Sequence, residues 1–189
     1  MKKSLGPKTI LFPTPVLIVG TYDAIGKPNA AAVAWGGICC SRPVAINISL
    51  RRATYTHGNI MSRQAFTVNI PPDKFVKEAD YFGIASGRKV DKFEATGLTS
   101  VASDLVDAPY IQEFPLILEC KLINTVEIGS HTQFIGEVLD VKAEKTILDM
   151  DGMPDVERIQ PFCYISSNRT YYNIGPFLAQ AFSVGQNIV

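Results

Sequence analysis

The segment Asn29–Asn59 reads NAAAVAWGGICCSRPVAINISLRRATYTHGN and predicts two short strands that end beside basic and hydroxyl side chains. The first strand, Asn29–Trp35, is built from small residues and carries the only tryptophan of the chain. A Gly-Cys-Ser turn is expected next, and the second strand, Val44–Leu50, runs directly into Arg51 and Arg52. Small side chains let a flat ring approach the backbone, and paired guanidinium groups suit a phosphate. The segment therefore indicates a nucleotide-like cofactor.

Further apolar runs extend this β pattern on both sides of the segment. Val16–Tyr22 is followed by the turn sequence DAIGKP, which predicts a hairpin with the small-residue strand. Ala65–Ile70 is another strand, and Leu116–Val126 with Thr132–Lys142 predicts a second hairpin around Glu127–His131. Because turns rather than regular helical crossovers join the strands, we expect a closed antiparallel barrel and not a doubly wound parallel sheet.

Helical signals are fewer than strand signals. Thr54–Arg63 predicts a short helix after the second strand, and Asp73–Ser86 begins with a capping aspartate. The mixed pattern of Lys92–Phe114 predicts loops. The sequence therefore predicts a mainly β fold in a single domain, residues 1–189, with about six or seven strands and a few short peripheral helices.

The composition narrows the class of protein. The chain has 189 residues, of which 47% are apolar and 19% charged, and 18 basic residues balance 18 acidic ones. These values are typical of a globular protein. A neutral balance argues against a general nucleic-acid or membrane-surface binder, because both need a positive field. Pro13 and Pro15 interrupt the apolar run near the N-terminus, so we expect neither a signal peptide nor a membrane span, and a cytoplasmic protein.

The cysteine and histidine patterns argue against a metal centre or a catalytic triad. The four cysteines show no zinc-ligand spacing, and the two histidines lie in separate segments. Neighbouring Cys39 and Cys40 rarely form a disulfide, because its geometry strains the peptide between them. We expect reduced thiols that are buried or close to a site. The glycine motifs of Rossmann and P-loop folds are also absent from the sequence.

The cluster after the second strand offers the donors that a phosphate monoester needs. Its members are Ser49, Arg51, Arg52, Thr54, Thr56 and His57. A helix that begins near Thr54 adds free backbone N–H groups. The motif SGRKVDKF, Ser86–Phe93, offers three cations from another loop and an aromatic ring. The alternative is a capped helix with solvated arginines and an ordinary surface turn.

Aromatic side chains and one histidine are further candidates for contact with a ring. The aromatic candidates are Trp35, Tyr55, Tyr81, Tyr171 and Tyr172. Packing is the commoner role of such residues. His131 lies at the tip of the second predicted hairpin, where it is either polar surface or a contact to a second substrate or to the edge of the bound ring.

The motifs of the chain, taken in order, resemble a known family. They are PTPVLIVGTYDAIGKPNAAAVAW, SRPVAINISLRRATYTHGNI, FTVNIP, SGRKVDKF and IGSHTQFIGEV. Their order and spacing resemble the flavin reductase-like proteins with the FMN-binding split-barrel fold, from about Pro15 to Tyr172. The resemblance implies a six-stranded antiparallel Greek-key barrel, a homodimer, and one FMN per subunit near the dimer interface.

The resemblance also implies which residues meet the cofactor. Those along the isoalloxazine ring would be Asn29, Ala31, Ala32, Val33, Ala34 and Trp35. Backbone groups of Cys39, Cys40 and Ser41 would meet the polar edge of the ring. The phosphate would be held by Ser49, Arg51, Arg52, Thr54 and the loop of Lys92. Thr56, Ser86 and Phe93 complete the candidate set.

Two positions depart from the pattern of the family. Many relatives have a threonine where this chain has Ala32, so a side-chain hydrogen bond to the flavin from that position is lost. Many also have an acidic residue before the hairpin histidine, where this chain has Ser130. That change weakens the expectation of efficient NAD(P)H oxidation.

The leading functional hypothesis is an FMN-dependent electron carrier or reductase, with a redox partner protein or NAD(P)H as electron donor. The flavin carries such chemistry itself, so no catalytic acid or base is required. Two alternatives remain: an NAD(P)H:flavin oxidoreductase or ferric reductase that releases reduced flavin, and a noncatalytic FMN-binding domain.

Overall fold

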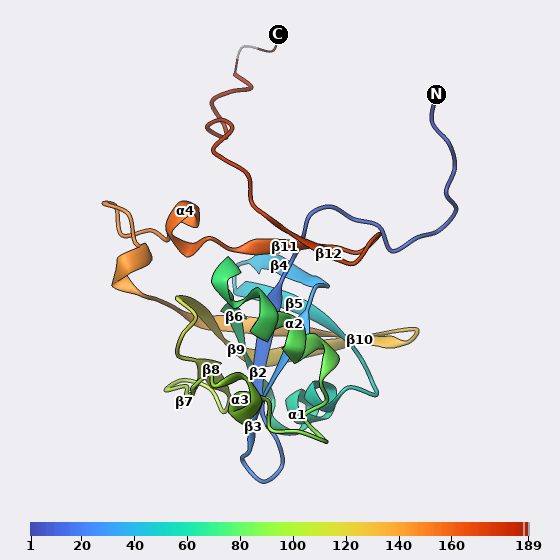
Figure 1. Cartoon of the computed structure of the whole chain (residues 1–189), viewed down its shortest axis with the longest axis vertical. Helices are drawn as coiled ribbons and strands as arrows, with labels where there is room; N and C mark the ends of the chain where they lie inside the picture. The colour runs from blue at the N-terminus through green and yellow to red at the C-terminus, as the bar shows by residue number, and fades with distance from the viewer. Residues whose placement is uncertain (187, 189) are drawn as a thin grey trace.

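The computed structural model describes residues 1–186 and 188, and its main element is an antiparallel sheet of seven strands (Figure 1). The strand order is β3-β2-β6-β9-β10-β5-β4. Its strands are β2 (Leu17–Tyr22), β3 (Pro28–Val33), β4 (Gly36–Ser41), β5 (Val44–Arg51), β6 (Ala65–Ile70), β9 (Leu116–Ile128) and β10 (His131–Ala143). Residues of β3, at one edge, also contact β5 near the other edge, so the sheet curls back on itself.

Two small sheets and a few short helices surround the main sheet. The small sheets are β1-β11-β12 (Thr14–Pro15, Phe162–Ile165 and Thr170–Asn173) and β7-β8 (Ser100–Ala102 and Pro109–Ile111). The α-helices are α1 (Tyr55–Arg63), α2 (Val76–Ile84), α3 (Lys92–Thr96) and α4 (Val156–Ile159), and the 3-10 turns are η1 (Asp73–Phe75) and η2 (Lys145–Ile147). The prediction of a mainly β fold is confirmed.

Strand β2 divides the core into two halves. Side chains alternate between the two faces of a strand, and both faces of β2 are buried. Leu17 and Val19 pack in one cluster with Phe66 and Phe134. Ile18 packs in the other, beneath α2 and α3, with Phe82, Phe114 and Phe162 among its neighbours. This double burial explains why Val16–Tyr22 reads as a continuous apolar run instead of an alternating one.

The predicted hairpins form where the turn residues require them. In the β2–β3 turn, Asp23 Oδ1 accepts from Ile25 N at 2.9 Å and from Lys27 N at 2.8 Å. Gly26 takes a left-handed φ of 85°, which glycine adopts at little cost. The second hairpin turns at Gly129 and Ser130, between β9 and β10. The helix predicted at Thr54–Arg63 is α1, and Thr54 Oγ1 caps it by accepting from His57 N at 3.3 Å.

Three sequence expectations about local structure are wrong. Residues 36–41 form strand β4 on the edge of the sheet instead of a turn. The helix expected at Asp73–Ser86 is split into η1 and α2. The expected loops of Lys92–Phe114 contain α3 and the β7–β8 pair, because Asp91 caps a helical turn through Phe93 N and Glu94 N.

Two general features of the described residues bear on function. No helix among residues 1–186 and 188 is both long enough and apolar enough to cross a bilayer. Within the same residues, no group of three or more histidine, cysteine or acidic side chains is arranged to hold a metal ion.

We expect Gly20→Ala to destabilise the protein by about 1–3 kcal/mol, because overpacked cores lose this much. A Cβ at Gly20 would overlap the Pro109 carbonyl oxygen and lie 2.5 Å from Thr67 Oγ1. These two atoms are already joined by a 2.6 Å hydrogen bond. Urea unfolding, monitored by far-UV circular dichroism, measures the change in the free energy of unfolding.

The matched control is Gly58→Ala in α1, where an added Cβ meets no atom within 4 Å. The free energy of unfolding of this variant should rise by up to about 1 kcal/mol, because alanine has a higher helix propensity than glycine. Equal stability of Gly20→Ala and the wild-type protein would contradict the packing of β2 against β8.

Candidate functional site

A groove runs along β3, the strand that pairs only with β2 in the main sheet. Its first part is a cavity of about 250 Å³ between β3, the start of α1 and the chain that follows α2. Among its lining residues are the predicted site residues Asn29, Ala31, Ala32, Thr54, Thr56, Ser86 and Lys92. Segments that lie far apart in the sequence therefore meet at one place.

The cavity continues along β3 into two further hollows. A second hollow of about 300 Å³ shares Ala32, Gly83 and Ile84 with the first and extends to Tyr164 and Tyr171. The third, here called the ring-end cavity, has about 570 Å³. Its lining residues are Lys8, Thr9, Ile10, Leu11, Pro13, Thr14, Pro15, Ala34, Trp35, Gly36, Gly37, Asn47 and Ser49. Shared residues join the three hollows into one continuous groove.

Asn29 leaves an unused acceptor in the first cavity. Its side chain is buried, and Nδ2 donates to Thr56 Oγ1 at 3.0 Å. Oδ1 is also buried but has no hydrogen-bond partner among the described residues. An unpaired buried acceptor is costly in a folded protein. Its position in a cavity wall is explained if a ligand donor pairs with it.

Lys92 places a buried cation in the same wall. Its Nζ donates to the carbonyl oxygens of Ala30 at 2.8 Å and Phe82 at 2.9 Å. An ammonium group has three donors, so one remains for a ligand. Burial lowers the pKa of Lys92 to about 8. An anion in the cavity would favour the charged form and raise this pKa.

The arginines near the first cavity are already partly engaged. Arg52 forms an exposed ion pair with Glu127, so its guanidinium faces the β9–β10 hairpin. Arg88, which belongs to the SGRKVDKF motif, lies over the Tyr55 ring at 5.3 Å and donates to Ala53 O at 2.8 Å. Glu127 was not a candidate in the sequence, because nothing in its neighbourhood along the chain indicates a partner just after β5.

Trp35, which lines the ring-end cavity, contacts His131. Their ring centroids lie 4.8 Å apart at an interplanar angle of 42°. Ser49 N donates to Trp35 O at 2.8 Å, which joins the start of β4 to β5. Strand register places His131 opposite Arg51. The hairpin tip that carries the histidine is therefore adjacent to the end of β5.

His57 reaches the same hairpin tip from α1. Its Nε2 lies 2.9 Å from Thr132 Oγ1, and that hydroxyl donates to Glu127 Oε1 at 2.9 Å. Because the Thr132 hydroxyl donates its own proton to the Glu127 carboxylate, it can only accept from His57. Nε2 of His57 is therefore protonated and donates to Thr132 Oγ1. Burial lowers the pKa of His57, the Glu127 carboxylate partly opposes this change, and Arg52 adds to it.

Several predicted contacts are not placed at the groove. Cys39, Cys40 and Ser41 lie on the edge strand β4, and both cysteines are exposed, where thiols buried or close to a site were expected. Cys40 pairs with Ala45 and Ser41 with Val44. They therefore sit at the opposite end of β5 from Ser49 and Arg51.

Phe93 also departs from its expected place. It is buried in the second core cluster, with its ring centroid 6.0 Å from that of Phe82. It is not among the residues that line the groove. In the short helix α3, the Phe93 side chain faces the core, whereas the side chain of Lys92, one position earlier, reaches the cavity.

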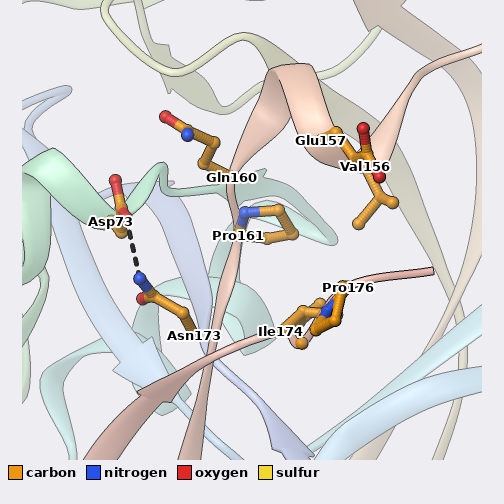
Figure 2. A pocket seen from close by; sticks show the side chains of 9 residues that line it. Asp73, Val156, Glu157, Gln160, Pro161, Asn173, Ile174 and Pro176 are labelled. Carbon is orange, nitrogen blue, oxygen red and sulfur yellow. Dashed lines mark hydrogen bonds between the residues drawn. The ribbon is translucent and has the colours of Figure 1, made fainter. Parts of the chain in front are cut away.

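A separate cavity of about 250 Å³ lies away from β3, where β12 ends (Figure 2). Asn173 Nδ2 donates to Asp73 Oδ2 at 3.1 Å on one side of it, and Gln160 and Pro161 line another. No residue of the candidate set lines this cavity. The groove along β3 is therefore the better candidate site.

Comparison with known proteins gives the following matches. A family model described as "Flavin reductase like domain" matches residues 9–173. The solved flavoredoxin of Desulfovibrio vulgaris (Miyazaki F) is 52% identical, with a TM-score of 0.94 over 98% of this chain and 100% of that chain. Flavoredoxin from Methanosarcina acetivorans is 27% identical, with a TM-score of 0.93 over 100% of both chains. A ferric-chelate reductase (NAD(P)H) of Archaeoglobus fulgidus is 27% identical over 56% of this chain and 62% of its own length.

We expect His57 to titrate below its ordinary pKa of about 6.5, and lower still in Glu127→Gln, which removes the carboxylate that favours the imidazolium. Because the folded-state pKa lies below the unfolded-state value, the linked stability is present above about pH 6.5 and is lost as the pH falls through the folded-state pKa. NMR titration of the imidazole carbons measures the pKa of His57 in the wild-type protein and in Glu127→Gln.

The chain has two histidines, so His131→Asn assigns the signals without ambiguity. A His57 pKa above 6.5, or one that rises in Glu127→Gln, would contradict the arrangement of the hairpin tip.

Proposed function

The chain belongs to the flavin reductase-like family, and we propose that it is a flavoredoxin-like redox protein that binds FMN along β3 and passes electrons or hydride to a downstream acceptor. The observation that carries the proposal is the groove along β3, with an unpaired buried acceptor and a buried cation in its wall. FMN supplies the redox chemistry when bound. The chain supplies binding, orientation and exclusion of water.

The donor set of the first cavity fits a phosphate tail. Lys92 offers a charged donor, and Thr56 and Ser86 offer hydroxyl groups. The first backbone N–H groups of α1 have no partner within the helix, and its first residues, Tyr55 and Thr56, line the cavity. Thr54 holds this helix start in place, because its hydroxyl donates to Arg51 O at 2.9 Å. We place the phosphate at this end.

The remaining length of the groove suits the flat ring. The side chains along β3 and just after it are small, so a ring can lie close to the backbone; they are Ala31, Ala32 and Ala34. With alanine at position 32, polar contacts from this strand are made by backbone groups and by Asn29. Trp35 lines the ring-end cavity and His131 packs against Trp35, so together they limit access of water and of a second reactant.

We further propose that the protein acts as a homodimer in the cytoplasm, and that a redox partner protein or NAD(P)H is its electron donor. The exposed apolar side chains of β4 and of both termini support a second chain as partner. A second candidate function is reduction of a ferric chelate, which the Archaeoglobus fulgidus relative named above favours.

Purified protein should be yellow and should retain FMN through gel filtration. Anaerobic addition of NADH, NADPH or a reduced redox protein should bleach the flavin absorbance. Stopped-flow spectroscopy records this change. Steady oxidation of NAD(P)H only in the presence of added free flavin would favour an oxidoreductase that releases reduced flavin. Absence of flavin binding on titration would contradict the proposal, and binding without reduction by every donor would favour a noncatalytic domain.

Lys92→Met should weaken FMN binding by about 10–100-fold, the usual worth of a charged hydrogen bond, but weaken riboflavin binding by less than about threefold. Riboflavin lacks the phosphate, so its affinity reports any general damage to the groove. In the wild-type protein, FMN affinity should fall as the pH rises through about 8, because Lys92 then loses its charge. Fluorescence quenching of the flavin measures each affinity.

Lys89→Met is the matched control, because Lys89 is exposed in the same loop and lies outside the groove. Its affinity for both flavins should stay within about twofold of wild type. Equal losses of FMN and riboflavin in Lys92→Met would count against a phosphate contact.

A further inference from the structure

The second hollow of the groove, of about 300 Å³, has walls that the flavin ring does not need. Besides β3 it is lined by residues of α2 and of the β11–β12 hairpin. Ala34 lines both this hollow and the ring-end cavity, so a reactant that enters beside Trp35 can extend into it. Two of its lining residues are aromatic and two are charged, and these four are Tyr164, Tyr171, Asp80 and Arg169.

The two tyrosines form a fixed aromatic wall. Tyr171 OH donates to Asp80 Oδ1 at 2.8 Å. The ring centroid of Tyr171 lies 5.7 Å from that of Tyr164 and 5.4 Å from that of Phe162. Burial, and then the hydrogen bond to Asp80, raise the pKa of Tyr171, so its hydroxyl stays protonated and keeps this bond. A wall held in this way suits a planar ring, because aromatic rings stack on one another.

Arg169 places an available cation in the same hollow. Its guanidinium group forms no hydrogen bond, ion pair or cation–π contact with residues 1–186 and 188, whereas Arg52 and Arg88 are both engaged. The backbone of Arg169 takes a left-handed φ of 57° in the β11–β12 turn. A residue with a Cβ adopts this conformation less readily than glycine does. The turn therefore carries an arginine at a position that favours a smaller residue.

The two charges of the hollow give it a direction. Asp80 comes from α2 and Arg169 from the hairpin turn, and among the described residues no ion pair joins them. An anionic group in the hollow is therefore repelled from the side of Asp80 and attracted to Arg169. A guanidinium group binds a carboxylate through two parallel hydrogen bonds. The remaining lining is largely apolar, as in most sites for small organic ligands, and includes Val16 and Val33.

We propose that this hollow is a binding subsite for a small planar carboxylate, held beside the flavin ring with its own ring against Tyr164 and Tyr171 and its carboxylate paired with Arg169. Arg169 then determines specificity, because it favours an anionic ligand over a neutral one of the same shape. A dinucleotide is the less suitable occupant, because the hollow has room for one ring with one acidic group. The proposal rests on FMN binding along β3.

The Nε–Hε NMR signal of Arg169 tests the contact directly. The signal is assigned by its loss in Arg169→Asn, a variant that suits the turn because asparagine adopts left-handed conformations readily. Benzoate is the probe, benzamide is its neutral counterpart, and AMP represents a nucleotide phosphate. In the flavin-loaded protein we expect benzoate to shift the signal saturably and to bind at least tenfold more tightly than benzamide. AMP should bind more weakly than benzoate.

The visible absorbance of bound FMN tests whether the ligand lies beside the flavin ring. Benzoate should perturb this spectrum with the same affinity that the Arg169 signal reports. In Arg169→Asn, benzoate affinity should fall at least tenfold, while benzamide affinity should stay within twofold and so exclude general damage to the hollow. Arg169→Lys keeps the charge without the planar fork, so its benzoate affinity should lie between these two variants of the site, wild type and Arg169→Asn.

Lys77→Met is the matched control, because it removes one positive charge from an exposed position of α2 outside the groove. Its benzoate affinity should stay within twofold of wild type. Equal binding of benzoate and benzamide, a response to AMP but not to benzoate, or benzoate binding that leaves the flavin spectrum unchanged would each overturn the proposal. If no flavin binds, the proposed function fails alone, and the Arg169 signal of the apoprotein still reports whether the carboxylate is held.

Discussion

The hydrogen bonds of the Lys92 ammonium group connect the elements that form the groove. A single buried cation bridges the Ala30 carbonyl on β3 and the Phe82 carbonyl on α2. It thereby ties the helix to an edge strand that has a strand partner on one side only. A second strand at this edge would fill the groove with backbone and side chains. The lysine satisfies backbone carbonyls and leaves space beside them, at the cost of burying a charge.

The groove makes chemical sense as a site because its polar groups are incompletely satisfied. Asn29 Oδ1 lacks a partner, Lys92 has a donor to spare, and the start of α1 offers backbone N–H groups. A ligand with an anionic tail and a ring that both donates and accepts hydrogen bonds satisfies all three. FMN is such a ligand, and the Trp35–His131 pair stands at the far end, where a second reactant would arrive.

Sequence reasoning worked best where local chemistry decides the structure. Alternation along β5, the Asp23–Gly26 turn and the Thr54 cap are visible in the chain itself, and the elements they specify formed at the expected residues. It failed at residues 36–41, where glycine and serine suggested a turn. Pairing with β5 overrode this preference and made the segment an edge strand. Phe93 and Lys92 were assigned to one loop, and the short helix α3 separated their directions.

By itself, the sequence determined the mainly β class, the two hairpins and the grouping of Asn29, Thr54 and Lys92 as candidates for one cofactor. These follow from the period of side chains and from residue types that occur close together or in recognisable motifs. Only the tertiary structure decided which of the polar groups were still available. Arg52, which follows β5, is paired with Glu127 on β9, whereas Asn29 Oδ1 is not paired. Hydrogen bonds between distant segments depend on how the strands pair, and no local pattern in the chain records that.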